Sequence, residues 1–310
     1  MYKLFIDGRE GTTGLRIAER LAGRSELELI ILPEAMRKDP AARAEALNAA
    51  DVAILCLPDA AAIEAVGMVK NDRTVIIDAS TAHRTNPLWT YGFPEVSRAL
   101  RMALPKAKRV AVPGCHASGF IALVKPLIEN GLLPPDALLS CHSLTGYSGG
   151  GKKMIAEYEG EGRDTLLDAP RQYGIGQTHK HLPEMQAQTG LTVPPIFSPI
   201  VSDFYSGMEV TVGLHAAQLS RGVGVKHIRE LYGELYSTRI VRYREGADEA
   251  GFLSAGALSG SDAMEIMVSG SDERILLTAR YDNLGKGASG AAVECLNILL
   301  GVPAETGLVL

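Results

Sequence analysis

The stretch YKLFIDGREGTTGLRIAERL, residues 2–21, joins a short apolar run, three glycines and an apolar pattern with helical spacing. The run Tyr2–Ile6 is rich in strand-forming residues, and apolar residues recur at helical spacing from Leu15 to Leu21. The glycines lie between the two, where the chain needs a tight turn. We therefore predict a strand, a glycine-rich turn and a helix.

The same alternation continues to about residue 112. Short apolar runs predict further strands at residues 27–32, 51–57, 74–78 and 109–112, and helices are expected at 41–48 and 60–69. Nearly continuous apolar strands that alternate with helices are typical of an α/β fold with a doubly wound parallel sheet, the Rossmann arrangement. We expect this domain to comprise residues 1–114 and 288–310.

The pattern changes after residue 115. We expect a helix from Ala117 to about Asn130, with Pro126 as a possible kink, and a glycine-rich loop at residues 145–153. Residues 208–214 alternate between apolar and polar, as half-buried strands do, and 264–268 and 274–281 are similar. Residues 115–287 are therefore expected to form an α+β domain with a mixed or antiparallel sheet, followed by an apolar helix at 289–300.

Composition limits the classes of function. The chain has 310 residues, 46% of them hydrophobic, and a formal net charge of −5. Its basic residues are dispersed, which argues against a nucleic-acid partner and favours a metabolite. The start of the chain lacks the pattern of a secretory leader, and no apolar run reaches membrane-spanning length. We expect a cytoplasmic protein with no membrane partner.

The glycine turn has the features of a dinucleotide site. Gly8, Gly11 and Gly14 would let the backbone approach a pyrophosphate, and the helix N-terminus would supply amides and a favourable dipole. Thr12 and Thr13 add hydroxyl donors. An ordinary strand-to-helix loop is the alternative, but a strand before the glycines and a helix after them favour the dinucleotide.

The choice between NAD and NADP stays open at this level. Glu34, after the second predicted strand, could bind the ribose hydroxyls of NAD, whereas Arg37 and Lys38 could bind the 2′-phosphate of NADP.

Cys115 is the candidate nucleophile among four widely spaced cysteines. In VPGCHASG it follows a predicted strand and begins a helix, where the helix dipole stabilises a thiolate at the ligand-binding edge of the sheet. We interpret Cys56 and Cys295 as buried and inert. Cys141, in an apolar strand-like run, is less clear. The spacing fits neither a disulfide framework nor a zinc site.

A thiolate nucleophile also needs a group that handles protons. The segment THKHLPE offers His179 and His181, followed by Glu184, which could orient an imidazole or bind substrate. His116, beside the cysteine, is a weaker alternative base. A metal site at the histidine pair is not expected, because no other residues complete a ligand set.

Seven motifs together are similar to the semialdehyde dehydrogenase family, and within it to the short-form N-acetyl-gamma-glutamyl-phosphate reductases. The resemblance covers essentially the whole chain. Its motifs are GREGTTG, DASTAHR with Ser80 and Arg84, YGFPE at 91–95, PGC at Cys115, GYSGGGK, HKHLPE, and DNLGKGASG at 282–290.

The resemblance implies a homo-oligomer, a dimer or tetramer, that uses NADP(H). It implies reduction of N-acetyl-L-glutamyl 5-phosphate to the 5-semialdehyde and phosphate through a thioester, in arginine biosynthesis. The residues that it implies are Cys115, His181 and His179 for catalysis, with His181 preferred as acid/base; Arg84, Glu184 and Ser148 for substrate; and Gly8, Gly11, Thr12, Thr13, Gly14, Arg37 and Asn283 for the cofactor. A surface role for Arg84 remains an alternative.

Three other functions share some of these residues. Aspartate-semialdehyde dehydrogenase would share the fold and the chemistry, but THKHLPE and YGFPE argue against it. A non-catalytic dinucleotide sensor would not need a cysteine at a helix start with histidines downstream. A cysteine hydrolase would not need the glycine turn.

Overall fold

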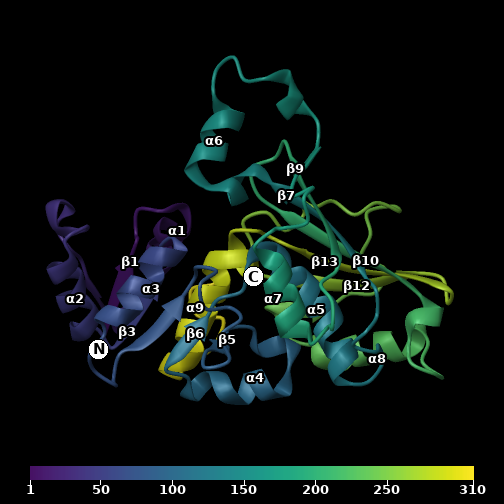
Figure 1. Cartoon of the computed structure of the whole chain (residues 1–310), viewed down its shortest axis with the longest axis horizontal. Coiled ribbons are helices and arrows are strands. Elements are labelled where there is room, and N and C mark those ends of the chain that lie inside the picture. The colour runs from purple at the N-terminus through teal and green to yellow at the C-terminus, as the bar shows by residue number, and fades with distance from the viewer. The chain divides into compact units, whose positions relative to one another are not determined.

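The computed structural model describes all 310 residues, which divide into two units. Unit 1 consists of residues 1–94, 99–113 and 288–308, and unit 2 consists of residues 95–98, 114–287 and 309–310. Figure 1 labels their elements.

Unit 1 contains a six-stranded sheet in which every pairing is parallel, with strand order β2-β1-β3-β4-β6-β5. Its strands are β1 (Tyr2–Asp7), β2 (Leu27–Ile30), β3 (Val52–Leu55), β4 (Val75–Asp78), β5 (Thr90–Tyr91) and β6 (Arg109–Ala111). Its helices are α1 (Thr12–Leu21), α2 (Pro40–Ala49), α3 (Asp59–Met68), α4 (Arg98–Ala103, apart from its first residue) and α9 (Gly290–Leu300). The chain reverses its direction of winding between β1 and β3, which is where such sheets bind ligands.

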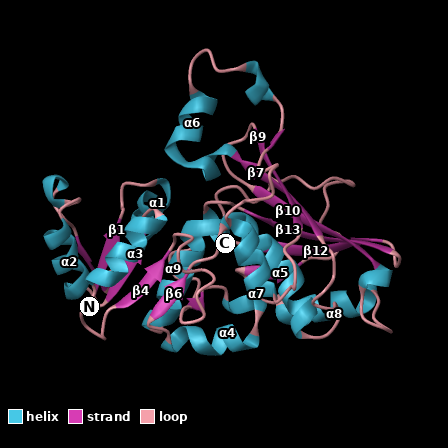
Figure 2. Ribbon diagram, in the orientation of Figure 1, coloured by secondary structure: helices cyan, strands magenta, loops and turns pink.

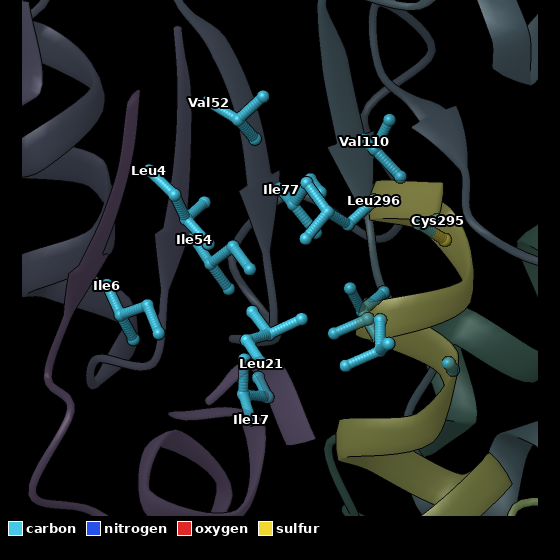
Figure 3. Close-up of a cluster of buried hydrophobic side chains, with 14 of the residues drawn as sticks. Leu4, Ile6, Ile17, Leu21, Val52, Ile54, Ile77, Val110, Cys295 and Leu296 are labelled. Atoms are coloured by element: carbon cyan, nitrogen blue, oxygen red, sulfur yellow. The ribbon is translucent and has the colours of Figure 1, made fainter. Parts of the chain in front are cut away.

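Helices cover both faces of this sheet because successive strand residues point to opposite sides. Leu4 and Ile6 pack in a cluster with α1 and α9, whereas Phe5 packs in a second cluster with α2 and α3. Figure 3 shows the first cluster, including Ile17 and Leu21 of α1 together with Leu296 of α9. The predicted Rossmann sheet is confirmed.

Unit 2 contains a seven-stranded mixed sheet, with order β11-β12-β13-β10-β7-β9-β8. Its strands are β7 (Ser140–Gly146), β8 (Arg171–Gln172), β9 (Ile196–Ser202), β10 (Met208–His215), β11 (Val241–Tyr243), β12 (Met264–Gly270) and β13 (Arg274–Tyr281). Its helices are α5 (Cys115–Glu129), α6 (Gly151–Glu159), α7 (His181–Thr189) and α8 (Val225–Leu235). Figure 2 shows this mixture of helix and sheet, and the predicted α+β fold is confirmed.

Two sequence predictions need correction. The expected loop at 145–153 is in fact the end of β7, a 3₁₀ turn (Tyr147–Gly150) and the start of α6, because the residues after the glycines are good helix formers. The second strand ends at Ile30 rather than at residue 32, and Ile31 is exposed.

Helix α5 begins at Cys115, two residues before the predicted start, and continues through Pro126 to Glu129. A proline inside a helix leaves the carbonyl four residues earlier without its usual partner. Here the Tyr236 hydroxyl donates to that carbonyl, on Ala122, at 2.6 Å. This replacement bond explains how the helix tolerates the proline.

Candidate active site

Cys115 is the first residue of α5 and is partly exposed. The preceding Gly114 is the N-cap and has no side chain to cap the helix. A thiolate at this position is favoured by the helix dipole. Cys141 and Cys295 are buried, whereas Cys56 is partly exposed rather than buried as predicted. Desolvation raises the pKa of the Cys56 thiol to about 12 and also raises the pKa of Cys141.

Tyr281, the last residue of β13, is inserted into the first turn of α5. The Gly119 amide donates to the Tyr281 hydroxyl at 3.0 Å, and that hydroxyl donates to the Cys115 carbonyl at 2.5 Å. In a regular helix the amide would bond this carbonyl directly. A Cβ on Gly119 would lie 2.8 Å from the Tyr281 hydroxyl, so glycine leaves room for the insertion. Tyr281 thereby holds the backbone of the cysteine.

The turn after β13 also passes close to the cysteine. Asp282 is fully buried and accepts hydrogen bonds from the amides of Leu284 and Gly285, at 2.6 and 3.0 Å. A Cβ on Gly287 would lie 3.2 Å from the Cys115 Cβ. The absence of a side chain at Gly287 therefore permits this close approach. Gly287 lies in a π-helical turn (Gly285–Ser289), and such turns are common at functional sites.

Three imidazoles form a cluster that includes His116, the residue directly after Cys115. The ring of His116 lies 5.9 Å from that of His179 and 5.6 Å from that of His181, and the last two rings are 4.8 Å apart. His181 is buried at the start of α7, and its amide donates to Nδ1 of His179 at 3.2 Å. Burial, and to a smaller extent Lys180, lower the pKa of His179, which favours its neutral form. Because Nδ1 accepts the hydrogen bond from the His181 amide, the proton of the neutral ring is on Nε2.

Both ring nitrogens of His116 have partners. Nδ1 lies 2.7 Å from the Ser143 hydroxyl, and Nε2 lies 2.7 Å from the Tyr173 hydroxyl. Burial, with a smaller contribution from His179, lowers the pKa of His116 to about 3. A neutral imidazole with both nitrogens engaged is poorly suited to be the base, which weakens the alternative that the sequence left open.

Glu184 lies in the first turn of α7 and is buried. Its Oε1 accepts a hydrogen bond from the Gly114 amide at 2.8 Å, so it connects α7 to the turn before the cysteine. Charge-assisted bonds of this kind are stronger than neutral ones. The structure thus links Glu184 to the residue before Cys115.

Two other predicted site residues bond each other. The Asn283 amide donates to the Ser148 hydroxyl at 3.0 Å, and its oxygen accepts from the Gly207 amide at 2.9 Å. The predicted cofactor residue and the predicted substrate residue therefore form one buried pair in unit 2.

The glycine turn lies in unit 1, at the carboxyl end of β1. Gly8 has a φ of +82°, and a Cβ there would lie 2.3 Å from the Cys56 carbonyl oxygen. A Cβ on Gly14 would lie 2.5 Å from the Gly8 oxygen. Thr12 and Thr13 begin α1, whose N-cap Gly11 provides no capping side chain. Uncapped amides beside glycines that allow a close approach fit a pyrophosphate.

Arg37 pairs with Glu10 of this turn at 3.1 Å, and both side chains are exposed. The structure therefore brings Arg37 to the glycine turn.

Arg84 is buried in unit 1 rather than exposed. Its Nε donates to the Val112 carbonyl at 2.9 Å, and its Nη2 donates to the Ala79 carbonyl at 3.0 Å. The preceding His83 stacks on Trp89 with ring centroids 4.0 Å apart and lies 2.6 Å from the buried Asp78 carboxylate. The surface role considered for Arg84 is therefore wrong.

Sequence reasoning missed Ser143, Tyr173 and Tyr281. Tyr281 precedes the DNLGKGASG motif and could have been found from its place at the end of a strand. Ser143 and Tyr173 have no telling spacing, because they reach His116 from separate strands and turns.

No group of three or more histidine, cysteine, aspartate and glutamate side chains is arranged to hold a metal ion. None of the helices combines the length and the apolar character that crossing a bilayer requires.

Comparison with known sequences gives matches along the chain. Residues 115–283 match the profile of the semialdehyde dehydrogenase dimerisation domain, and residues 34–102 match that of the semialdehyde dehydrogenase NAD binding domain. N-acetyl-gamma-glutamyl-phosphate reductase of Burkholderia lata is 46% identical over 304 residues, which is 96% of each chain. The protein of that name from Chelativorans sp. is 45% identical, covering 96% of this chain and 98% of the other.

Solved structures support the same fold. Aspartate semialdehyde dehydrogenase II of Vibrio cholerae, complexed with ASA, superposes with a TM-score of 0.72 at 15% identity, over 97% of this chain and 98% of the other. Aspartate semialdehyde dehydrogenase of Candida albicans, solved with NADP, has a TM-score of 0.67 at 14% identity, with the same coverage.

Proposed function

The chain belongs to the semialdehyde dehydrogenase family, in its N-acetyl-gamma-glutamyl-phosphate reductase branch, and from this we propose how its residues carry out the reaction. That reaction is the reversible NADPH-dependent reduction of N-acetyl-L-glutamyl 5-phosphate to N-acetyl-L-glutamate 5-semialdehyde and phosphate, a step of arginine biosynthesis. The observation that carries the assignment of roles is the position of Cys115 at the start of α5, next to His116, whose ring lies among those of His179 and His181.

Cys115 acts as the nucleophile. Its thiolate attacks the acyl carbonyl, the bond to the phosphate oxygen breaks, and a thioester remains on the sulfur. NADPH, when bound, supplies the hydride that reduces the thioester. Collapse of the resulting tetrahedral adduct breaks the carbon–sulfur bond and releases the aldehyde. A thioester suits this step because its carbonyl is more electrophilic than that of an ester.

His181 serves as acid and base. It takes the proton of the Cys115 thiol and later returns a proton to the leaving thiolate. His179 holds the start of α7, which carries His181, because His179 Nδ1 accepts a hydrogen bond from the His181 backbone amide. Glu184 holds the Gly114 amide and so fixes the turn from which Cys115 projects.

Three buried residues bind the substrate and the cofactor: Arg84, and the hydrogen-bonded pair Ser148 and Asn283. Arg84 supplies positive charge for the phosphate or carboxylate of the substrate, while its Nε and Nη2 hold backbone carbonyls. Ser148 contributes to substrate binding and Asn283 to cofactor binding, each fixed by the bond between them.

The cofactor is NADP(H). Gly8, Gly11 and Gly14 would hold its pyrophosphate, with the Thr12 and Thr13 hydroxyls as donors, and Arg37 would bind the 2′-phosphate. We assign this role to a dinucleotide-binding domain of residues 1–114 and 288–310, and the thioester chemistry to a catalytic and oligomerisation domain of residues 115–287.

The chain self-associates, as a dimer or tetramer, through the sheet of unit 2. Val210 faces α5 on one side of this sheet, as its contact with the Gly119 position indicates. On the opposite side Leu276 is 46% exposed and Ile196 is 65% exposed. Exposed apolar residues on a sheet face that lacks helices suit contact with a second copy. A cytoplasmic location is also proposed, since the four cysteines form no disulfide.

The test follows NADP reduction by purified protein with phosphate and N-acetylglutamate 5-semialdehyde, beside aspartate semialdehyde. We expect turnover with the acetylated substrate and its loss in Cys115→Ala. Turnover with aspartate semialdehyde alone would assign the chain to that sister activity, and activity that survives in Cys115→Ala would exclude the thioester.

A further inference from the structure

Three polar side chains, Ser143, His116 and Tyr173, are joined by hydrogen bonds between the sheet of unit 2 and the start of α5. The fully buried Ser143, on β7, bonds Nδ1 of His116, and Nε2 of His116 bonds the Tyr173 hydroxyl, both at 2.7 Å. The three residues come from β7, α5 and the segment after β8. None of the three has a role in the reaction steps proposed for Cys115 and His181.

Of the two arrangements of protons along these hydrogen bonds, one leaves a proton without an acceptor only on Tyr173, which is part-buried, and the other leaves one on the fully buried Ser143. The Ser143 hydroxyl is buried, and its hydrogen-bond partner is His116 Nδ1. If Ser143 donates to Nδ1, the neutral imidazole carries its proton on Nε2 and donates it to the Tyr173 oxygen. In the other tautomer the buried serine proton would have no acceptor, which is costly. The Tyr173 oxygen is therefore an acceptor toward His116, and its own proton can be donated elsewhere.

The Tyr173 hydroxyl bonds the side chain of His116, the residue that directly follows Cys115. Burial and the Cys115 thiolate raise the pKa of Tyr173 above its usual value, so the hydroxyl stays protonated. Its ring is also 5.8 Å from that of His179. A protonated phenol beside the nucleophile is a hydrogen-bond donor for negative charge that develops there.

The reaction needs such a donor. Each tetrahedral adduct at Cys115 places a negative charge on the former carbonyl oxygen. One nearby amide is engaged elsewhere, because Gly114 donates to Glu184. The first turn of α5 thus offers fewer backbone donors than a regular uncapped helix start.

From this arrangement we propose that Tyr173 is a further catalytic residue, whose hydroxyl donates to the oxyanion of the adduct at Cys115. His116 and Ser143 are positioning residues that hold its oxygen and leave its proton available. The inference rests on the proposed function, since it requires an acyl group on Cys115.

The first test is Tyr173→Phe, which removes only the hydroxyl. We expect kcat to fall about 100-fold, the scale of losing one oxyanion donor, with KM within about threefold of wild type. The rate at which iodoacetamide alkylates Cys115 should remain the same, because the thiolate itself is intact. The matched control is Tyr236→Phe, another buried tyrosine whose hydroxyl holds a carbonyl of α5. It should lower the melting temperature but leave kcat within about twofold.

The second test separates positioning by His116 from direct catalysis. His116→Phe keeps a ring of similar shape and removes both nitrogens, so kcat should fall about as far as in Tyr173→Phe. If His116 acts through Tyr173, the double variant His116→Phe with Tyr173→Phe should have the same kcat as Tyr173→Phe alone. His116→Gln, whose amide can donate toward Tyr173, should recover most of the loss.

Two outcomes would overturn the inference. One is a Tyr173→Phe enzyme with kcat within threefold of wild type, while Cys115→Ala is inactive; the proposed function would then stand without this residue. The other is a double variant in which the two losses multiply, which would make His116 an independent catalyst. An inactive wild type or an active Cys115→Ala would instead count against the proposed function itself.

Discussion

A buried ion pair in unit 2 allows a prediction with a defined magnitude. Lys286 Nζ lies 2.8 Å from Glu95 Oε1, and the two side chains are only 2% and 5% exposed. Oε2 of the same carboxylate is buried and has no hydrogen-bond partner. Lys286→Met keeps most of the side-chain volume but leaves the charge of Glu95 without its partner.

The expected cost follows from this burial. Removing one member of a buried pair destabilises proteins by about 3–5 kcal/mol, whereas an exposed pair contributes up to about 1 kcal/mol. Because Oε2 of Glu95 also lacks a partner, we expect Lys286→Met to lower the free energy of unfolding by an amount in the upper part of this range. Replacing both members with apolar residues is often neutral, so Glu95→Leu with Lys286→Met should recover most of the loss.

Urea unfolding measures this cost. Far-UV circular dichroism reports on both units, while fluorescence of Trp89, the single tryptophan, reports on unit 1. If the units unfold separately, Lys286→Met should shift the transition seen by circular dichroism but not the one seen by fluorescence. A loss below about 1 kcal/mol, or a double variant as unstable as the sum of the single ones, would refute the reasoning, because the pair would then behave as an exposed one.

Three further predictions concern the site. Arg37→Ala should raise KM for NADPH about five- to tenfold and leave KM for NADH nearly unchanged, because the lost charge would meet the 2′-phosphate, which NADH lacks; equal changes of KM for the two cofactors would contradict this role. Glu184→Ala leaves the Gly114 amide without an acceptor and should cost about 1–3 kcal/mol in urea unfolding and lower kcat, whereas Glu184→Gln keeps an acceptor and should stay near wild type in both. The pKa of His116 is about 3 when folded and near 6.5 when unfolded, so the unfolded chain binds more protons between these values and stability falls as pH falls. His116→Gln should therefore lose about 1.4 kcal/mol less per pH unit than wild type below pH 6; parallel stability curves for the two proteins would refute the buried neutral imidazole.

The nucleotide-binding fold could be predicted from sequence because its signals are local. Strand and helix periodicity in the first 112 residues, and the spacing of Gly8, Gly11 and Gly14, depend on neighbours along the chain. The position of Cys115 could also be predicted, since a residue that follows a strand and begins a helix can be recognised from a short stretch of sequence. The start of α6 was missed because three glycines suggest a loop, while the helix begins immediately after them.

By itself the sequence determined the parallel sheet, the glycine turn and the place of Cys115 at a helix start. Only the tertiary structure decided which partners these residues have. Glu184 reaches Gly114 across 70 positions and Tyr281 reaches Cys115 across 166, and no periodicity encodes contacts between such distant segments. The protonation of His116 likewise depends on burial and on Ser143 and Tyr173, which chain folding brings together. A pKa is set by all the groups around a side chain, so it emerges only once the fold has placed them.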